Sequence, residues 1–117
     1  MSEVELPAQI QEQLRRLQQL QQTLQVVVTQ KQQLDLESSE VEQALSELEK
    51  MDDDATIYKS IGSLLVKSEK QKVIDELKER KELLNTRISV LTRQRSRVEE
   101  RMKGLQKTVQ ERLKPLT

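Results

Sequence analysis

The stretch 55-ATIYKSIGSLLVKSEKQ-71 interrupts a chain that is otherwise suited to long helices. On both sides of it the sequence is polar, rich in Gln, Glu, Lys and Arg, and almost free of Gly and Pro. Within it, β-branched, aliphatic and small residues surround Gly62 and Ser63, a pair that suits the two central positions of a type II′ turn. The stretch therefore predicts a β-hairpin over residues 55–68.

The turn fixes the pairing of the two predicted strands. The pairs expected outward from it are Ile61–Leu64, Ser60–Leu65, Lys59–Val66 and Tyr58–Lys67. One face of the hairpin then collects most of the aliphatic side chains, namely Ile57, Ile61, Leu64 and Val66, with Lys59 as the exception. The other face, with Tyr58 and Leu65, is mixed.

A two-stranded hairpin is marginal in water on its own, and its outer edges present unpaired backbone groups. We expect the helices to bury their apolar stripes against each other, which leaves nothing in the chain to cover the hairpin. Hairpins from several chains would then pair edge to edge into a closed barrel. The residues expected to mediate this assembly are Ile57, Tyr58, Ile61, Gly62, Leu64, Leu65 and Val66. A loose linker is the alternative, and the alternation and the turn residues argue against it.

Heptad patterns flank the hairpin on both sides. From Leu6 to Leu48, ten of thirteen a and d positions are apolar, and from Ile74 to Arg112 nine of twelve are. Patterns of this length predict coiled-coil helices, which we place at residues 7–51 and 69–114. The ends agree with this placement: Pro7 suits a first turn, three aspartates at 52–54 disfavour a helix C-terminus, and residues 68–71 read as a capping box.

Charge favours a chain that folds back on itself. Residues 1–50 carry nine acidic and four basic side chains, whereas residues 69–117 carry eight acidic and fourteen basic ones. Arms of opposite charge attract when they lie side by side. One continuous helix is the alternative, because Gly62 would cost it only about 1 kcal/mol, but the heptad frame does not continue across residues 52–68. The predicted fold is mainly α, a long antiparallel coiled-coil helical hairpin with one central β-hairpin that joins an intersubunit β-barrel.

Composition excludes several kinds of function. Only 34% of the residues are hydrophobic, Tyr58 is the one aromatic residue, and Cys and His are absent. Thiolate chemistry and the usual zinc sites are therefore excluded, and two glycines cannot build a phosphate-binding loop. The chain has no apolar run near the ~20 residues of a membrane span, and its N-terminus lacks a signal-peptide pattern. We expect a cytoplasmic protein that is not an enzyme, with no cofactor, no metal and no membrane partner.

Two charged runs have competing interpretations. In 93-RQRSRVEERMK-103, Arg93, Arg97 and Arg101 share one helical face, as a nucleic-acid patch would require. However, two glutamates interrupt the run, no aromatic residue offers stacking, and the first arm is acidic. We interpret it as a solvated face beside an acidic neighbour and expect no nucleic-acid partner. The three aspartates lack the spacing and the Gly of a calcium loop, so we interpret them as a helix stop.

Folding back also brings the two chain ends together. The apolar residues near these ends are Val4, Leu6, Ile10, Val109, Leu113 and Leu116. Ile10 and Val109 fit ordinary coiled-coil core, while the other four lie at or beyond the helix ends. A small apolar patch on a charged tip suits weak binding of many unfolded chains, so we expect the six to form a client-binding site. The alternative is an adaptor coiled coil that recruits specific helical partners.

These features together resemble the beta-class subunits of prefoldin. The likeness covers nearly the whole chain, and its specific part is the motif YK-x-x-G-x-x-LVK, from Tyr58 to Lys67, between the two arms. It implies a single prefoldin-like domain over residues 1–117 that joins alpha-type subunits in a hexamer of two alpha and four beta subunits, with a double β-barrel and six coiled coils. It further implies an ATP-independent holdase that captures unfolded polypeptides at the coiled-coil tips and transfers them to a group II chaperonin.

The fold-back is testable because the chain has no native cysteine. Cysteines that replace Leu20 and Leu105 should be joined within one chain by a short thiol crosslinker, since antiparallel arms place these positions opposite each other. Electrophoresis under denaturing conditions and the mass of the crosslinked species report the result, with the two single-cysteine variants as controls. Crosslinks that form only between chains would contradict the fold-back.

Overall fold

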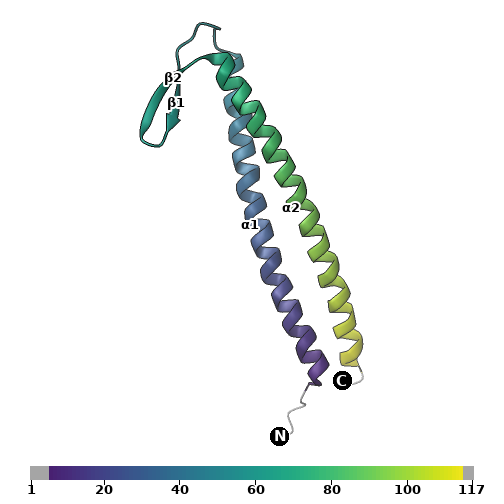
Figure 1. Cartoon of the computed structure of the whole chain (residues 1–117). Helices are drawn as coiled ribbons and strands as arrows, with labels where there is room; N and C mark the ends of the chain where they lie inside the picture. Colours follow the sequence, from purple (N-terminus) through teal and green to yellow (C-terminus); the bar gives the residue numbers. More distant parts are fainter. Residues whose placement is uncertain (1–5, 115–117) are drawn as a thin grey trace. The chain divides into compact units, whose positions relative to one another are not determined.

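The computed structural model describes residues 6–114. Its elements follow the order helix α1, Ala8–Glu49; strand β1, Ile57–Ile61; strand β2, Leu64–Ser68; and helix α2, Lys70–Leu113 (Figure 1). The predicted fold of two long helices with one central β-hairpin is confirmed. Helix α1 begins one residue later and ends two residues earlier than expected, and α2 is shorter by one residue at each end.

The chain divides into two compact units. We call residues 1–31 and 90–117 the terminal unit and residues 32–89 the hairpin unit. Each unit contains a segment of α1 and a segment of α2, and the hairpin belongs to the second unit. The units are described separately below.

Backbone hydrogen bonds account for the two ends of α1. At its start, the carbonyl of Pro7 accepts from the amides of Ile10 and Gln11 at 3.0 and 3.1 Å, so Pro7 opens the helix without having to donate a hydrogen bond itself. After its end, the amide of Met51 donates to the carbonyl of Leu48 at 3.2 Å. This shorter i to i+3 spacing is typical of a last helical turn before the chain leaves the axis.

The capping box predicted for α2 does not form. Ser68 is the last residue of β2 and pairs with Ile57 in the ladder. Gln71 donates instead to the carboxylate of Asp75 at 3.0 Å, one turn further along the helix, and the carbonyl of Glu69 accepts the amide hydrogen bond that opens α2. The strand therefore extends through the position that the sequence motif assigned to the cap.

The hairpin has the predicted register, with Ile61 opposite Leu64 beside the turn. Gly62 has a φ of 57°, in the left-handed region that Gly adopts without strain. Ser63 does not have a positive φ. A type I′ turn needs positive φ at both central residues, whereas type II′ needs it only at the first, so these angles agree with the predicted turn.

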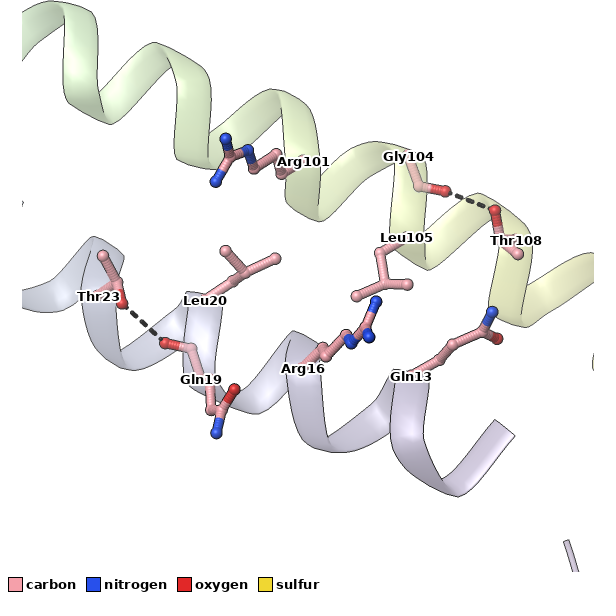
Figure 2. A pocket seen from close by; sticks show the side chains of 9 residues that line it. All are labelled: Gln13, Arg16, Gln19, Leu20, Thr23, Arg101, Gly104, Leu105 and Thr108. Carbon is pink, nitrogen blue, oxygen red and sulfur yellow. Dashed lines mark hydrogen bonds between the residues drawn. The ribbon is translucent and has the colours of Figure 1, made fainter. Parts of the chain in front are cut away.

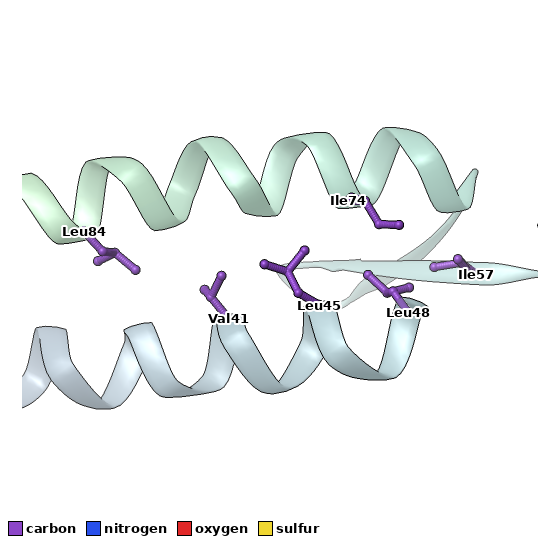
Figure 3. Packing of buried hydrophobic residues seen from close by; sticks show 6 residues of the cluster. All are labelled: Val41, Leu45, Leu48, Ile57, Ile74 and Leu84. Carbon is purple, nitrogen blue, oxygen red and sulfur yellow. The ribbon is translucent and has the colours of Figure 1, made fainter. Parts of the chain in front are cut away.

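The core of the hairpin unit joins both helices to β1. It consists of Val41, Leu45, Leu48, Ile57, Ile74 and Leu84 (Figure 3). Leu84 is fully buried, and Ile57 keeps only 8% of its surface exposed. The expectation that nothing in this chain covers the aliphatic face of the hairpin is therefore wrong for Ile57. Leu48 and Ile74 lie near the ends of their helices, so no further coiled-coil layer follows them, and Ile57 covers that end of the core.

Charged pairs cross between the helices of the hairpin unit, as the fold-back predicts. Arg80 Nε donates to Glu37 Oε1 at 2.8 Å, and Lys81 Nζ lies 3.3 Å from Glu42 Oε1. Leu48, near the end of α1, and Ile74, near the start of α2, lie in one core cluster, so the two segments are antiparallel.

The terminal unit has its own line of buried apolar side chains between α1 and α2, which we call its seam. Ile10 and Val27 of α1 and Val98 and Val109 of α2 are buried. Arg112 Nη1 donates to Gln9 Oε1 at 2.9 Å, across a sequence separation of 103 residues. In this unit too, the start of α1 lies beside the end of α2, which agrees with the predicted fold-back.

Lys70 connects the two ends of the segment that carries the hairpin. Its Nζ donates to the carbonyl of Met51 at 2.8 Å and to Asp53 Oδ1 at 3.1 Å, and only 13% of its side chain is exposed. Lys70→Met keeps most of the apolar stem and removes the donor. We expect the free energy of unfolding to fall by about 1–2 kcal/mol, because the Met51 carbonyl loses a charged partner. Urea unfolding followed by circular dichroism measures the change. Lys72→Met, at an exposed position on the same turn, is the matched control, and an equal loss in both variants would contradict the assignment.

Candidate functional site

Large apolar side chains are exposed on the hairpin. We define the hairpin surface as Tyr58, Ile61, Leu64, Leu65 and Val66, whose exposed fractions run from 44% for Val66 to 73% for Leu65. All five are among the residues predicted to mediate assembly. The described sheet has only two strands, so each strand also has an unpaired edge. Exposed apolar side chains beside unpaired edges are typical of a surface that binds another protein.

The base of the hairpin is fixed to the helices at two points on β1. Ile57 lies in the core of the hairpin unit. Lys59, on the same face two residues later, forms an ion pair with Glu76 of α2, with Nζ and Oε2 2.6 Å apart. This hydrogen bond holds the pKa of Glu76 below its ordinary value of 4.5. Both anchors precede the turn, so the hairpin surface lies on a supported element rather than on a loose linker.

The predicted client-binding residues do not form one exposed patch. Ile10 and Val109 are buried in the terminal unit, with 3% and 5% of their surfaces exposed, because they form one of the last layers of its seam. Leu6 and Leu113 are half-buried. Val4 and Leu116 lie outside the described residues. Ile10 and Val109 thus hold the helices together, and the role of the other four in client binding stays a prediction.

The interpretation of the basic run at 93–103 is wrong in one respect. The α1 segment of the same unit is not acidic: from Leu6 to Lys31 it contains a single acidic residue, Glu12. Arg15 donates to Glu12 Oε1 at 2.7 Å, and this hydrogen bond lowers the pKa of Glu12. The terminal unit carries eleven Lys and Arg against six Asp and Glu, and the hairpin unit carries nine against fourteen. The terminal unit is therefore net positive and the hairpin unit net negative, so charge differs between the units as well as between the arms.

The sequence analysis also missed a hollow of about 690 Å³ in the terminal unit (Figure 2). Its walls come from both helices and include Gln13, Arg16, Leu20, Arg101, Gly104 and Leu105. Two features of the sequence indicate it in retrospect: a polar residue, Gln13, at a d position, and a glycine, Gly104, inside a helix. Gln13 replaces an apolar side chain between the helices, and Gly104, beside Leu105, leaves the wall of the hollow without a side chain.

Other kinds of site have no counterpart in the described part of the chain. Among residues 6–114, no group of three or more His, Cys, Asp or Glu side chains could hold a metal ion. Nor is either described helix long and apolar enough to cross a membrane.

The fold and the hairpin surface define a class of proteins in which one β-hairpin links two long coiled-coil helices. Comparison with known proteins agrees with this class. A sequence model of prefoldin subunits matches residues 11–115. The prefoldin beta subunit of Pyrococcus furiosus is 43% identical over 112 residues, which is 96% of each chain. That of Archaeoglobus fulgidus is 46% identical over 111 residues, 95% of this chain and 96% of the relative.

The structural comparison gives the same result. The crystal structure of the prefoldin beta subunit from Thermococcus strain KS-1 matches with a TM-score of 0.88 and 43% identity, covering 95% of this chain and 97% of that one. The chain belongs to the prefoldin subunit family. Membership supports a role as a chaperone and assembly with other prefoldin subunits.

Proposed function

We propose that this chain is the beta-type subunit of a prefoldin hexamer and acts there as an ATP-independent holdase for unfolded polypeptides. The observation that carries the proposal is the hairpin surface, five large apolar side chains exposed on an element that is fixed at its base. A subunit that worked alone would have no use for this surface. Its exposure is expected if hairpins of neighbouring subunits cover it.

Edge pairing of hairpins would bury the apolar side chains and satisfy the unpaired backbone groups at once. Fully burying a Leu, Ile or Val side chain contributes about 1.5–3 kcal/mol. The four aliphatic residues of the hairpin surface, Ile61, Leu64, Leu65 and Val66, would therefore supply most of the free energy of association. In the proposed assembly, four such chains and two alpha-type subunits form a double β-barrel in the cytoplasm.

Client capture would then use the free ends of the coiled coils. Each terminal unit offers few aliphatic side chains, so one unit binds an unfolded segment weakly. Several units on one assembly raise the effective concentration, and avidity adds a factor on the order of 100 or more without new contacts. A captured client is released to a group II chaperonin without nucleotide hydrolysis by this subunit.

The first test concerns assembly. The double variant Ile61→Asp and Leu64→Asp places two charges on the hairpin surface, and an unpaired buried charge costs several kcal/mol. We expect the variant to stay helical by circular dichroism and to fall to monomers by light scattering, alone and with the alpha-type subunit. Gln18→Asp with Gln22→Asp, at exposed helix positions, adds the same charge and should leave the assembly intact. Assembly of the hairpin variant would mean that the helices carry the contacts.

The second test concerns client capture. Deleting residues 1–7 and 114–117 from the assembled protein removes three of the six apolar residues predicted at the chain ends, Val4, Leu6 and Leu116. We expect several-fold weaker protection of a denatured client from aggregation, followed by light scattering, while the oligomer changes only by the deleted mass. Two unrelated clients should be affected alike. An adaptor protein would protect neither client even at full length, and full protection by the truncated assembly would place the client site elsewhere.

A further inference from the structure

Heptad spacing places Arg16 and Arg101 in facing positions within the terminal unit. In the hairpin unit the corresponding positions hold Glu37 and Arg80, which form an ion pair between the helices. Arg16 lies three heptads before Glu37, and Arg101 lies three heptads after Arg80. Opposed positions in antiparallel helices repeat with the heptad, and opposite charges stabilise them. The terminal unit therefore has two cations where the hairpin unit has a salt bridge.

These two cations are poorly neutralised. The side chain of Arg101 makes no hydrogen bond or ion pair with any described residue. Arg16 Nε lies 3.6 Å from Glu12 Oε1, but the same oxygen accepts a hydrogen bond from Arg15 at 2.7 Å. Like charges in facing positions disfavour the paired helices. A carboxylate bound to either arginine would reduce this repulsion.

The hollow between the two arginines is also partly apolar. Figure 2 shows Leu20 and Leu105 extending from opposite helices into the space between them, with the head group of Arg101 near Leu20 and that of Arg16 near Leu105. A side chain of a bound segment could pack on both leucines while its neighbour reaches an arginine. The site thus offers a cationic and an aliphatic contact within one hollow.

Two further residues leave the hollow open to a peptide. A Cβ added to Gly104 would meet nothing within 4 Å, so packing does not require glycine there, although glycine weakens a helix relative to alanine. Gln13 Oε1 is buried without a hydrogen-bond partner among residues 6–114. An acceptor in that state lacks a partner within the unit, and a rotation of the Gln13 side chain toward the hollow would bring it to a backbone N–H of an incoming chain. Neither feature is explained by the stability of the unit itself.

We propose that this hollow binds extended segments of unfolded clients in which an acidic side chain stands next to an aliphatic one. The inference rests on the proposed holdase function and adds a substrate class to it. Arg16 or Arg101 binds the carboxylate, Leu20 and Leu105 contact the aliphatic side chain, and Gln13, once its side chain turns toward the hollow, accepts a hydrogen bond from the backbone. A nucleic acid fits less well, because its phosphates would use only the arginines and the chain's one aromatic residue, Tyr58, lies in the hairpin unit.

The test uses the full chain in its assembled form and three short fluorescent peptides of Leu, Ser and one variable residue, which is Glu, Gln or Lys. Fluorescence anisotropy near physiological salt measures their affinities. We expect the Glu peptide to bind about fivefold more tightly than the Gln peptide, as one partly exposed charge contact allows, and the Lys peptide to bind most weakly. Equal binding of the three peptides would overturn the proposal.

Two variants and a control locate the site. Arg101→Glu restores an ion pair with Arg16 by analogy with Glu37 and Arg80, so it keeps the fold while removing the preference for the Glu peptide. Gly104→Leu fills the hollow without changing charge and should weaken all three peptides several-fold. Lys107→Glu makes the same charge change at an exposed position that does not line the hollow and should keep the preference. If Lys107→Glu loses it as Arg101→Glu does, the effect is one of net charge and the proposal fails.

Failure of this inference is distinguishable from failure of the holdase function. The same variants are assayed for protection of a denatured client from aggregation. If the wild-type assembly protects the client but binds the three peptides equally, the proposed holdase function stands and the proposed preference of the hollow for acidic segments fails. If the wild-type assembly protects no client, the proposed holdase function itself fails. Displacement of the Glu peptide by a single-stranded oligonucleotide, abolished by Arg101→Glu and not by Lys107→Glu, would assign the hollow to nucleic acid instead.

Discussion

Burial in this protein depends on narrow seams between paired helices. With no Phe or Trp and one Tyr in 117 residues, the chain cannot build the wide core that aromatic side chains usually supply. Leu, Ile and Val at heptad positions are what remains, and each layer of a seam covers only its neighbours. A longer helix pair adds further layers of such side chains, but the last layer at each end has no neighbour on one side. The two units differ in what covers that last layer.

In the hairpin unit the chain itself covers the end of the seam. Ile57 packs with Leu48 and Ile74, and Lys70 satisfies the Met51 carbonyl and Asp53 next to it. The same arrangement supports the base of β1 and leaves the hairpin surface exposed on both strands. Local stability and the exposed apolar surface thus come from different residues of one hairpin. A hairpin without Ile57 and Lys59 as anchors would be marginal, and its apolar side chains would be exposed on a loose segment.

Much of the fold was predictable because its signals are periodic or local. The heptads define both helices, and the Gly62-Ser63 turn fixes the strand register, since each depends on spacing along the chain alone. The burial of Ile57 was not predictable in this way, because it depends on how the end of a seam lies in space. The cap predicted at Ser68 was wrong because Ser68 is the last residue of a strand. The capping motif considers only the helix that follows and takes no account of the strand that precedes it. The neighbourhood of the basic run was misjudged because charge was summed over whole arms.

The chain's net charge of zero has a different meaning when charges are compared between facing positions of the two helices instead of being summed over each arm. A net charge of zero combines a hairpin unit in which Glu37 and Glu42 pair with cations of α2 and a terminal unit in which Arg101 has no partner among the described residues. Paired charges favour one arrangement of the helices, so they suit the unit that must present a hairpin in a defined way. An unpaired cation beside a partly filled layer of side chains weakens the unit that holds it, and a ligand that supplies an anion would stabilise that unit. In the proposed holdase, which would assemble through its hairpin and meet clients at its terminal unit, this separation lets one part be rigid and the other adaptable, because the two demands fall on different stretches of the same two helices.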